Sequence, residues 1–157
     1  MKENVFKTQF TQSLSVEDKK WWHDNIQKIT NNKIQFNDNV NLDFKGVDAF
    51  INNVKIQLKL RETLYNDVAL EFAHSNKDLG WITKQNQLCE YLFYGFRPSN
   101  KIIVFKWSVL QKYWEKENVS LIEHYNIIKA KNCNKWSFNC CVPIRKLKEK
   151  NIILKIA

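Results

Sequence analysis

Three polar residues in one short stretch have the types and spacing needed for metal-assisted chemistry. Asp48 lies in "FKGVDAFINN", and Gln57 and Lys59 lie in "VKIQLKL", which follows at once. A carboxylate and an amide oxygen side by side can bind Mg²⁺, which takes few protein oxygens and keeps water or substrate phosphate at its other positions. A nearby ammonium can orient an attacking water, help to deprotonate it, or balance charge on a phosphorane-like transition state. If the three side chains meet, the sequence predicts metal-assisted phosphodiester hydrolysis.

A β-hairpin would bring these side chains together. A two-residue turn at Asn52-Asn53 is favoured because Asn tolerates positive φ better than most residues. Pairing outward from this turn opposes Asp48 to Gln57, with Cβ atoms roughly 4.5–5.5 Å apart, and places Lys59 two residues along on the same face. The alternative is a solvated sheet face on which Asp48 and Lys59 form an ordinary surface ion pair. The register is well specified because the other face is apolar throughout; it carries Val47, Ala49, Ile51, Val54, Ile56, Leu58 and Leu60.

The pattern "GVDAFINNVKIQLK" resembles the core motif of the PD-(D/E)XK nuclease superfamily. In that motif an Asp begins a hairpin and (Asp/Glu/Gln)-x-Lys follows on the next strand, so Asp48 takes the first position and Gln57 and Lys59 form a Q-x-K variant. Gln instead of Glu is a departure that weakens metal binding through lost charge. The downstream run "LEFAHSNKDLGWITKQNQLCEYLFYGF" resembles a block of small phage-like and bacterial relatives, in which the matching residues are Glu71, Ser75, Gly80-Trp81 and Glu90-Tyr91.

This resemblance implies a restriction-endonuclease-like fold and a Mg²⁺-dependent DNA endonuclease, with Mn²⁺ as a substitute metal. Asp48, Gln57 and the carbonyl of Leu58 would bind the metal, and Lys59 would assist the attacking water. Relatives often add an acidic residue from the first helix. Many dimerise to cut two strands, so the resemblance leaves both a monomer and a homodimer open. The candidates to complete the acidic set are Glu17, Asp24 and Glu71.

Basic residues around the hairpin are candidate phosphate contacts. The chain has 25 Lys and Arg against 16 Asp and Glu, a net charge of +9, which favours a polyanionic partner, nucleic acid first and an anionic membrane surface second. DNA is the expected partner, in duplex, branched or single-stranded form, and RNA stays open. The alternative function is a nuclease-like scaffold without catalysis that binds nucleic acid or a protein. The four candidate contacts are Arg61, Lys77, Lys84 and Arg97.

The order of the expected elements, a helix, several strands and then mixed elements, indicates an α/β (α+β) protein with a mixed central sheet flanked by helices. A helix is expected from Ser15, its N-cap, to Thr30. Alternating apolar residues predict strands, and the stretch 83–96 predicts a short helix followed by a strand. A second helix is expected over 108–118 with Ser108 as its cap. The expected strands cover 33–37, 39–51, 54–60, 67–74, 101–107 and a final stretch ending at Pro143.

Length and composition predict one domain over residues 1–157. No apolar run approaches the ~20 residues that span a bilayer, and "MKENVFKTQF" lacks the pattern of a signal peptide, so a cytoplasmic protein without a membrane partner is expected. The four cysteines show no CxxC spacing and are expected to be reduced, mostly buried thiols. A zinc site built from Cys133, Cys140 and His124 is the alternative.

Overall fold

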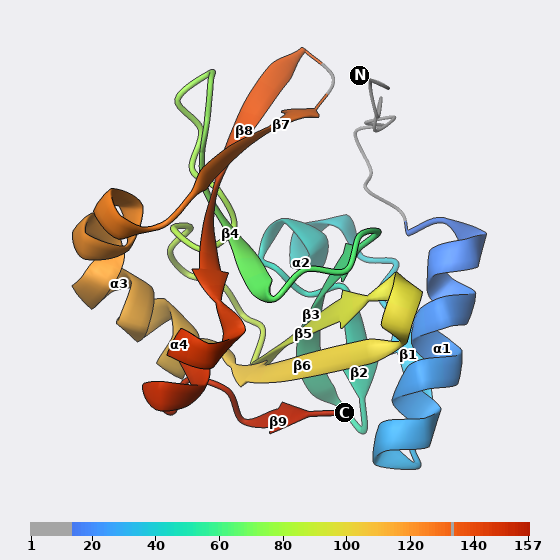
Figure 1. The fold of residues 1–157 in the computed structure, drawn as a ribbon. Coiled ribbons are helices and arrows are strands. Elements are labelled where there is room, and N and C mark those ends of the chain that lie inside the picture. The colour runs from blue at the N-terminus through green and yellow to red at the C-terminus, as the bar shows by residue number, and fades with distance from the viewer. Residues whose placement is uncertain (1–13, 133) are drawn as a thin grey trace.

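The structure is a computed structural model that describes residues 14–132 and 134–157. Cys133 and the N-terminal stretch "MKENVFKTQF" lie outside these described residues. No helix in the described parts of the chain is long and apolar enough to cross a membrane. The elements follow one another along the chain (Figure 1) as α1 (Val16–Thr30), β1 (Ile34–Phe36), α2 (Val40–Phe44), β2 (Ala49–Ile51), β3 (Val54–Arg61), β4 (Asp67–His74), β5 (Tyr91–Phe96), the 3₁₀ turn η1 (Arg97–Ser99), β6 (Lys101–Lys106), α3 (Trp107–His124), β7 (Ile127–Asn132), β8 (Lys135–Pro143), α4 (Ile144–Glu149) and β9 (Lys155–Ile156).

Two β-sheets organise the fold. The larger sheet has the strand order β1-β2-β3-β5-β6-β9 and is mixed, because β3 and β5 run parallel while its other neighbours are antiparallel. The smaller sheet, β4-β8-β7, is antiparallel throughout. The predicted α/β class with a mixed central sheet and flanking helices is confirmed, whereas the expected single domain over 1–157 stays a prediction.

The β2–β3 hairpin has the predicted register. Ala49 pairs with Ile56 and Ile51 with Val54. Asn52 and Asn53 form the turn with φ values of 49° and 64°, the left-handed conformation that Asn tolerates. The pairing ends at Ala49 and Ile56, and the Asp48 N–H also donates to the Ile56 carbonyl, so the direct opposition of Asp48 to Gln57 stays a prediction.

Helix α1 covers the apolar face of the hairpin. Ser15 caps the helix by accepting a hydrogen bond from the Asp18 N–H. Trp21 and Trp22 pack on the sheet at Gly95, where a Cβ atom would lie 2.6 Å from the Trp21 ring, so this position requires glycine. The core on this side also contains Ile26, Ala49, Ile51, Ile56, Leu58, Phe93, Ile102 and Val104. Val47, predicted for this face, is fully buried but belongs to neither core cluster.

The opposite face of the large sheet carries the second core. Leu92 and Tyr94 of β5 pack there against Leu70 of the small sheet and Leu110 of α3. Tyr94 also accepts a hydrogen bond from the Ala69 N–H at 3.1 Å, which ties β4 to the large sheet. Residues paired across parallel strands share a face, and Gln57 pairs with Leu92 while Lys59 pairs with Tyr94. The polar side of the hairpin therefore lies on the side of the large sheet that the small sheet covers.

Three sequence predictions of local structure are wrong. The expected strand over 39–51 contains helix α2 and becomes a strand only at Ala49, because Asn39 caps a short helix by accepting from the Asn41 and Leu42 N–H groups. Ser108 is no cap: α3 begins one residue earlier, at the buried Trp107, after Lys106, which makes no side-chain cap bond. The stretch 83–90 forms turns rather than a helix. Strand β7 had no counterpart among the predicted elements.

Candidate active site on the β2–β3 hairpin

Asp48 is held at the start of the hairpin by two backbone groups of β3. Its N–H donates to the Ile56 carbonyl at 2.9 Å, and its Oδ2 accepts from the Leu58 N–H at 2.6 Å. The carboxylate thus takes a donor that would otherwise pair with a strand carbonyl. The hydrogen bond from Leu58 to Oδ2 fixes the orientation of the Asp48 carboxylate.

A second carboxylate, Asp43, lies beside Asp48 and was not among the predicted site residues. Helix α2 ends in a Schellman motif, in which the Val47 N–H donates to Leu42 and the Gly46 N–H donates to Asp43. Gly46 has φ +75°, a conformation that favours glycine. A Cβ atom there would also lie 2.2 Å from Gln87 Oε1. This tight reversal brings Asp48 back beside the end of α2.

The electrostatics of the site centre on Asp48, a half-buried carboxylate. Burial raises its pKa from 3.8 to about 6; Lys59 and the Leu58 N–H oppose that rise, and the neighbouring Asp43 adds to it. Two carboxylates close together repel one another, and a bound cation relieves this repulsion. A proton shared with Asp43, whose side chain is a hydrogen-bond partner of Asp48, relieves it as well.

Gln57 is a buried polar side chain, only 4% exposed. Its Oε1 lies 4.0 Å from the Sγ of buried Cys89, a weak sulfur donor. Burial raises the pKa of the Cys89 thiol to about 12, and the Asp48 charge contributes to this rise. Cys89 is thus a neutral thiol that lines the site behind the amide.

Lys59 completes the predicted triad. Its Nζ lies 5.5 Å from the ring centroid of Trp81, a cation–π arrangement that holds the ammonium over an aromatic face. Trp81 follows Gly80, whose N–H donates to Phe72 of β4. The segment after β4 therefore helps to position the β3 lysine. The same ammonium lowers the pKa of Asp48, so the two charges sense one another across the hairpin.

The donor set is composed of oxygens. Asp43, Asp48, the Gln57 amide and the Leu58 carbonyl are the ligand types that Mg²⁺ prefers, and one or two carboxylates suffice for this metal. Among the described residues no group of three or more His, Cys, Asp or Glu side chains is placed to hold a metal ion. Cys89, Cys140 and Cys141 are buried free thiols as predicted. The zinc alternative required Cys133, which lies outside the described residues.

The other predicted acidic residues are not brought to Asp48 by any contact that the described residues show. Glu17 and Asp24 are exposed on α1, which packs on the opposite face of the large sheet, so neither fits the role expected of a first-helix carboxylate. Glu71 Oε1 instead lies 3.2 Å from His74 Nε2. Burial lowers the pKa of His74, although Glu71 opposes that effect.

Two of the four predicted phosphate contacts are engaged within the protein. Arg61 pairs with Asp67 and stacks over Tyr65, 4.3 Å from the ring centroid. Arg97 pairs with Asp18 and Glu62. Both guanidiniums therefore have partners within the protein, and their expected phosphate contacts stay predictions. Lys77 and Lys84 are exposed, in the segment between β4 and β5.

Comparison with protein families, curated proteins and solved structures found no match for this chain. The nuclease resemblance therefore stays a prediction carried by the motif. In the structure, Glu90 of the downstream block accepts a hydrogen bond from the Lys55 N–H at 2.9 Å. Ser75 of the same block accepts one from the Trp136 N–H. These two residues have structural partners in the fold and do not contribute to the oxygen donor set.

Proposed function

We propose that this chain is a Mg²⁺-dependent DNA endonuclease whose site is the polar side of the β2–β3 hairpin. The environment of Asp48 supports the proposal: burial and Asp43 together raise its pKa to about 6, and Lys59 lies within electrostatic reach. Its charge also acts on Cys89, whose Sγ lies 4.0 Å from Gln57 Oε1. An ordinary solvated sheet face does not bury a glutamine to 4% exposure beside a carboxylate pair. The alternative of a plain surface ion pair is therefore disfavoured.

Mg²⁺ fits this donor set. Asp48 and Asp43 would provide the charge, and the Gln57 amide and Leu58 carbonyl would provide neutral oxygens, with Mn²⁺ able to substitute. When bound, the metal would activate water and neutralise negative charge on the phosphate. The repulsion within the carboxylate pair is the feature of this structure that a divalent cation would relieve.

The residues of the chain have distinct roles in the proposed hydrolysis. Lys59, held over Trp81, orients the attacking water and balances charge as it accumulates on the phosphate oxygens. The water oxygen bonds to phosphorus, its proton passes to solvent, and the bond from phosphorus to the leaving sugar oxygen breaks. That oxygen then takes a proton from solvent, so one end carries a phosphate and the other a hydroxyl. Asp48 must be ionised throughout.

A nucleic-acid-binding module without catalysis is the second candidate. The observation that favours it is the engagement of two ligand atoms within the protein: Asp48 Oδ2 accepts from Leu58, and Gln57 Oε1 faces the Cys89 thiol. Under this alternative the hairpin would be a braced structural element.

Incubation of the purified protein with supercoiled plasmid separates the two functions. The nuclease predicts nicked and linear DNA with Mg²⁺ or Mn²⁺ and none with a chelator. DNA binding without nicking, at any concentration of either metal, would support the binding module. The same assay on single-stranded DNA, branched DNA and RNA defines the substrate.

A further inference from the structure

A projection of two strands and a turn extends from the small sheet, and we name it the basic arm. It consists of β7, residues 135–138 of β8, and the turn 75–78 that follows β4. Figure 1 shows β7 and the start of β8 standing out from the rest of the protein, with that turn beside them. The Ser75 N–H donates to the Trp136 carbonyl at 2.8 Å, and the Trp136 N–H donates back to Ser75 Oγ at 2.9 Å. The turn and the hairpin thus form one braced unit.

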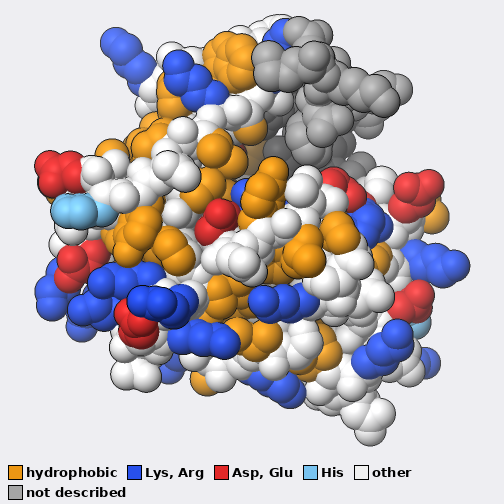
Figure 2. All heavy atoms as spheres, viewed as in Figure 1, with side chains coloured by type: hydrophobic (Ala, Val, Ile, Leu, Met, Phe, Trp, Pro, Cys, Tyr) orange, Lys and Arg blue, Asp and Glu red, His pale blue; other side chains and the backbone are white. Residues whose placement is uncertain are grey.

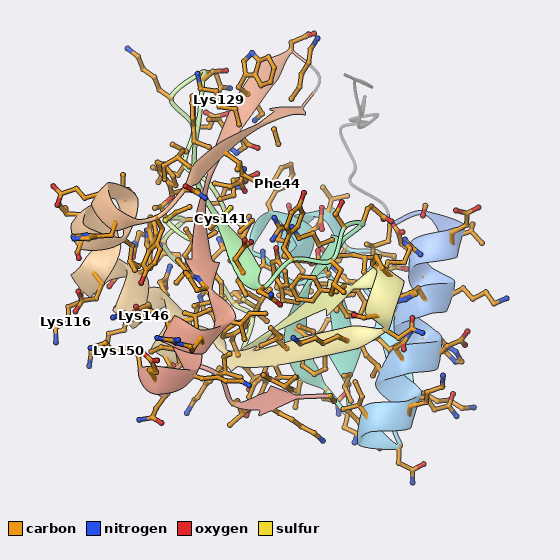
Figure 3. All side chains as sticks on the ribbon, in the orientation of Figure 1. Phe44, Lys116, Lys129, Cys141, Lys146 and Lys150 are labelled. Atoms are coloured by element: carbon orange, nitrogen blue, oxygen red, sulfur yellow. The ribbon has the colours of Figure 1, made fainter. Side chains whose placement is uncertain are left out.

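One face of the basic arm combines lysines with aromatic rings. Lys129 pairs with Phe138 and Lys131 pairs with Trp136, so alternation places all four side chains on the same face. The Lys129 Nζ lies 5.7 Å from the Phe138 ring centroid, and Trp136 is 45% exposed. Figure 2 shows basic and hydrophobic side chains together at the upper end of the molecule, where Figure 3 places Lys129.

The basic arm has a net positive charge. Its lysines are Lys77, Lys129, Lys131 and Lys135, and its only carboxylate in the sequence is Asp78, which pairs with Lys135 at 3.4 Å. An exposed indole among lysines is the combination that binds single-stranded nucleic acid, because unpaired bases offer a free ring face for stacking while the backbone needs cations. In a duplex the base faces are already stacked, so a flat indole gains less there.

The basic arm and the candidate active site lie on the same side of the large sheet. Leu70 of β4 and Cys140 of β8, which belong to the small sheet that continues into the arm, pack in one core cluster with Tyr94 of β5. Tyr94 pairs with Lys59 and therefore shares its face. Helix α1 covers the opposite side. A strand held on the arm would approach the hairpin without crossing the sheet.

We propose that the basic arm binds a single-stranded segment of the substrate by stacking an unpaired base on Trp136 and contacting its backbone through Lys129. This rests on the proposed nuclease function, since it names the form of nucleic acid that the active site receives. The substrate class is therefore DNA with an unpaired region, either single-stranded or branched.

Binding without cleavage tests the proposal. The anisotropy of a fluorescein-labelled oligo-dT strand of about 15 nucleotides is measured with wild-type protein in the presence of a chelator, beside a blunt duplex of equal length. Trp136→Ala should weaken binding of the single strand about five- to hundredfold, and Trp136→Phe should restore most of it. Leu154→Ala, an exposed apolar residue outside the arm, is the matched control and should leave the affinity unchanged.

The charge contribution is tested in parallel. Lys129→Gln should lower the slope of log affinity against log salt by about 0.7, the value for one phosphate contact on a single strand. Lys150→Gln, at the end of α4 (Figure 3), should leave the slope unchanged. Circular dichroism of each variant establishes that it is folded.

The outcomes separate the two proposals. Equal affinity of wild type and Trp136→Ala for the single strand, or no preference of wild type for the single strand over the duplex, would overturn the role of the arm even if the protein cleaves DNA. If single-strand affinity depends on Trp136 but the protein cleaves no DNA, the proposed role of the basic arm would be supported and the proposed nuclease function rejected.

Discussion

Asp48 Oδ2 accepts a hydrogen bond of 2.6 Å from the backbone N–H of Leu58, yet the pKa of this carboxyl is raised to about 6. A hydrogen bond to a carboxylate ordinarily lowers its pKa, so the effects of burial and of Asp43 outweigh both this bond and the Lys59 charge. The folded protein therefore holds a carboxylate under conditions that disfavour its charge. This conflict is typical of functional sites.

The first prediction concerns stability and pH. Because the pKa of Asp48 is about 6 in the folded state against 3.8 unfolded, the folded protein binds more protons between about pH 4 and pH 6. The contribution of Asp48 to stability is therefore greatest below pH 4 and is lost as the pH rises through 6. Asp48→Asn should raise the free energy of unfolding at pH 7 by about 1–2 kcal/mol, after allowance for partial exposure.

Urea denaturation at several pH values measures this effect. The wild type should lose stability relative to Asp48→Asn as the pH rises from 4 to 6, and the two curves should run parallel above that range. A variant that is less stable than wild type at pH 7 would show that the carboxylate supports the fold, contrary to this account.

The second prediction concerns the metal. Mg²⁺ should raise the melting temperature of the wild type, because a ligand that binds only the folded state stabilises it. Asp48→Asn should abolish this shift and Asp43→Asn should reduce it. Gln57→Glu adds a negative ligand and should give a larger shift at the same Mg²⁺ concentration. Equal shifts in wild type and Asp48→Asn would place the cation elsewhere on the protein.

The third prediction concerns the ammonium of the site. Lys59→Ala should lower the single-turnover rate of cleavage about 10²–10⁴-fold, because water orientation and charge balance are both lost. Lys55→Ala is the matched control, since Lys55 lies on the same strand and face, on the other side of Gln57. Lys55→Ala should weaken DNA binding more than it lowers the single-turnover rate of cleavage. Equal losses of rate in both variants would indicate a general effect of positive charge.

The fourth prediction separates structural from DNA-binding cations. Arg61→Gln removes a partner of Asp67 and should lower the free energy of unfolding by about 1.5–3 kcal/mol. Lys84→Gln should leave stability unchanged but weaken DNA binding alike across sequences, with a smaller salt slope. Denaturation curves and anisotropy titrations at two salt concentrations measure both effects. A Lys84 variant with an unchanged salt slope would remove this residue from the interface.

The hairpin could be predicted from the sequence because its determinants are local. The Asn52-Asn53 turn and the alternation of apolar residues fix the register, and both can be read from neighbouring positions. Asp43 was missed because Val40, Leu42 and Phe44 alternate with polar residues, which indicates a strand. Asn39 as a helix cap and Gly46 as a helix stop were the signals that compete with that pattern.

The partners of the arginines could not be predicted in the same way. Arg97 pairs with Asp18, 79 residues away in the sequence, and no local pattern indicates which carboxylate a guanidinium will meet. The exclusion of Glu17 from the site likewise follows from the face of the sheet that α1 covers. Such relationships depend on tertiary packing.

The most direct test of the central claim is nicking of supercoiled plasmid by wild type and by Asp48→Asn at matched concentrations with Mg²⁺. Asp24→Asn, an exposed residue of α1, serves as the control. Wild type and Asp24→Asn should nick the plasmid, and an Asp48→Asn protein that is folded and still binds DNA should not. Cleavage by Asp48→Asn at the wild-type rate would contradict this prediction, because the hairpin would then be a structural surface with no part in the chemistry.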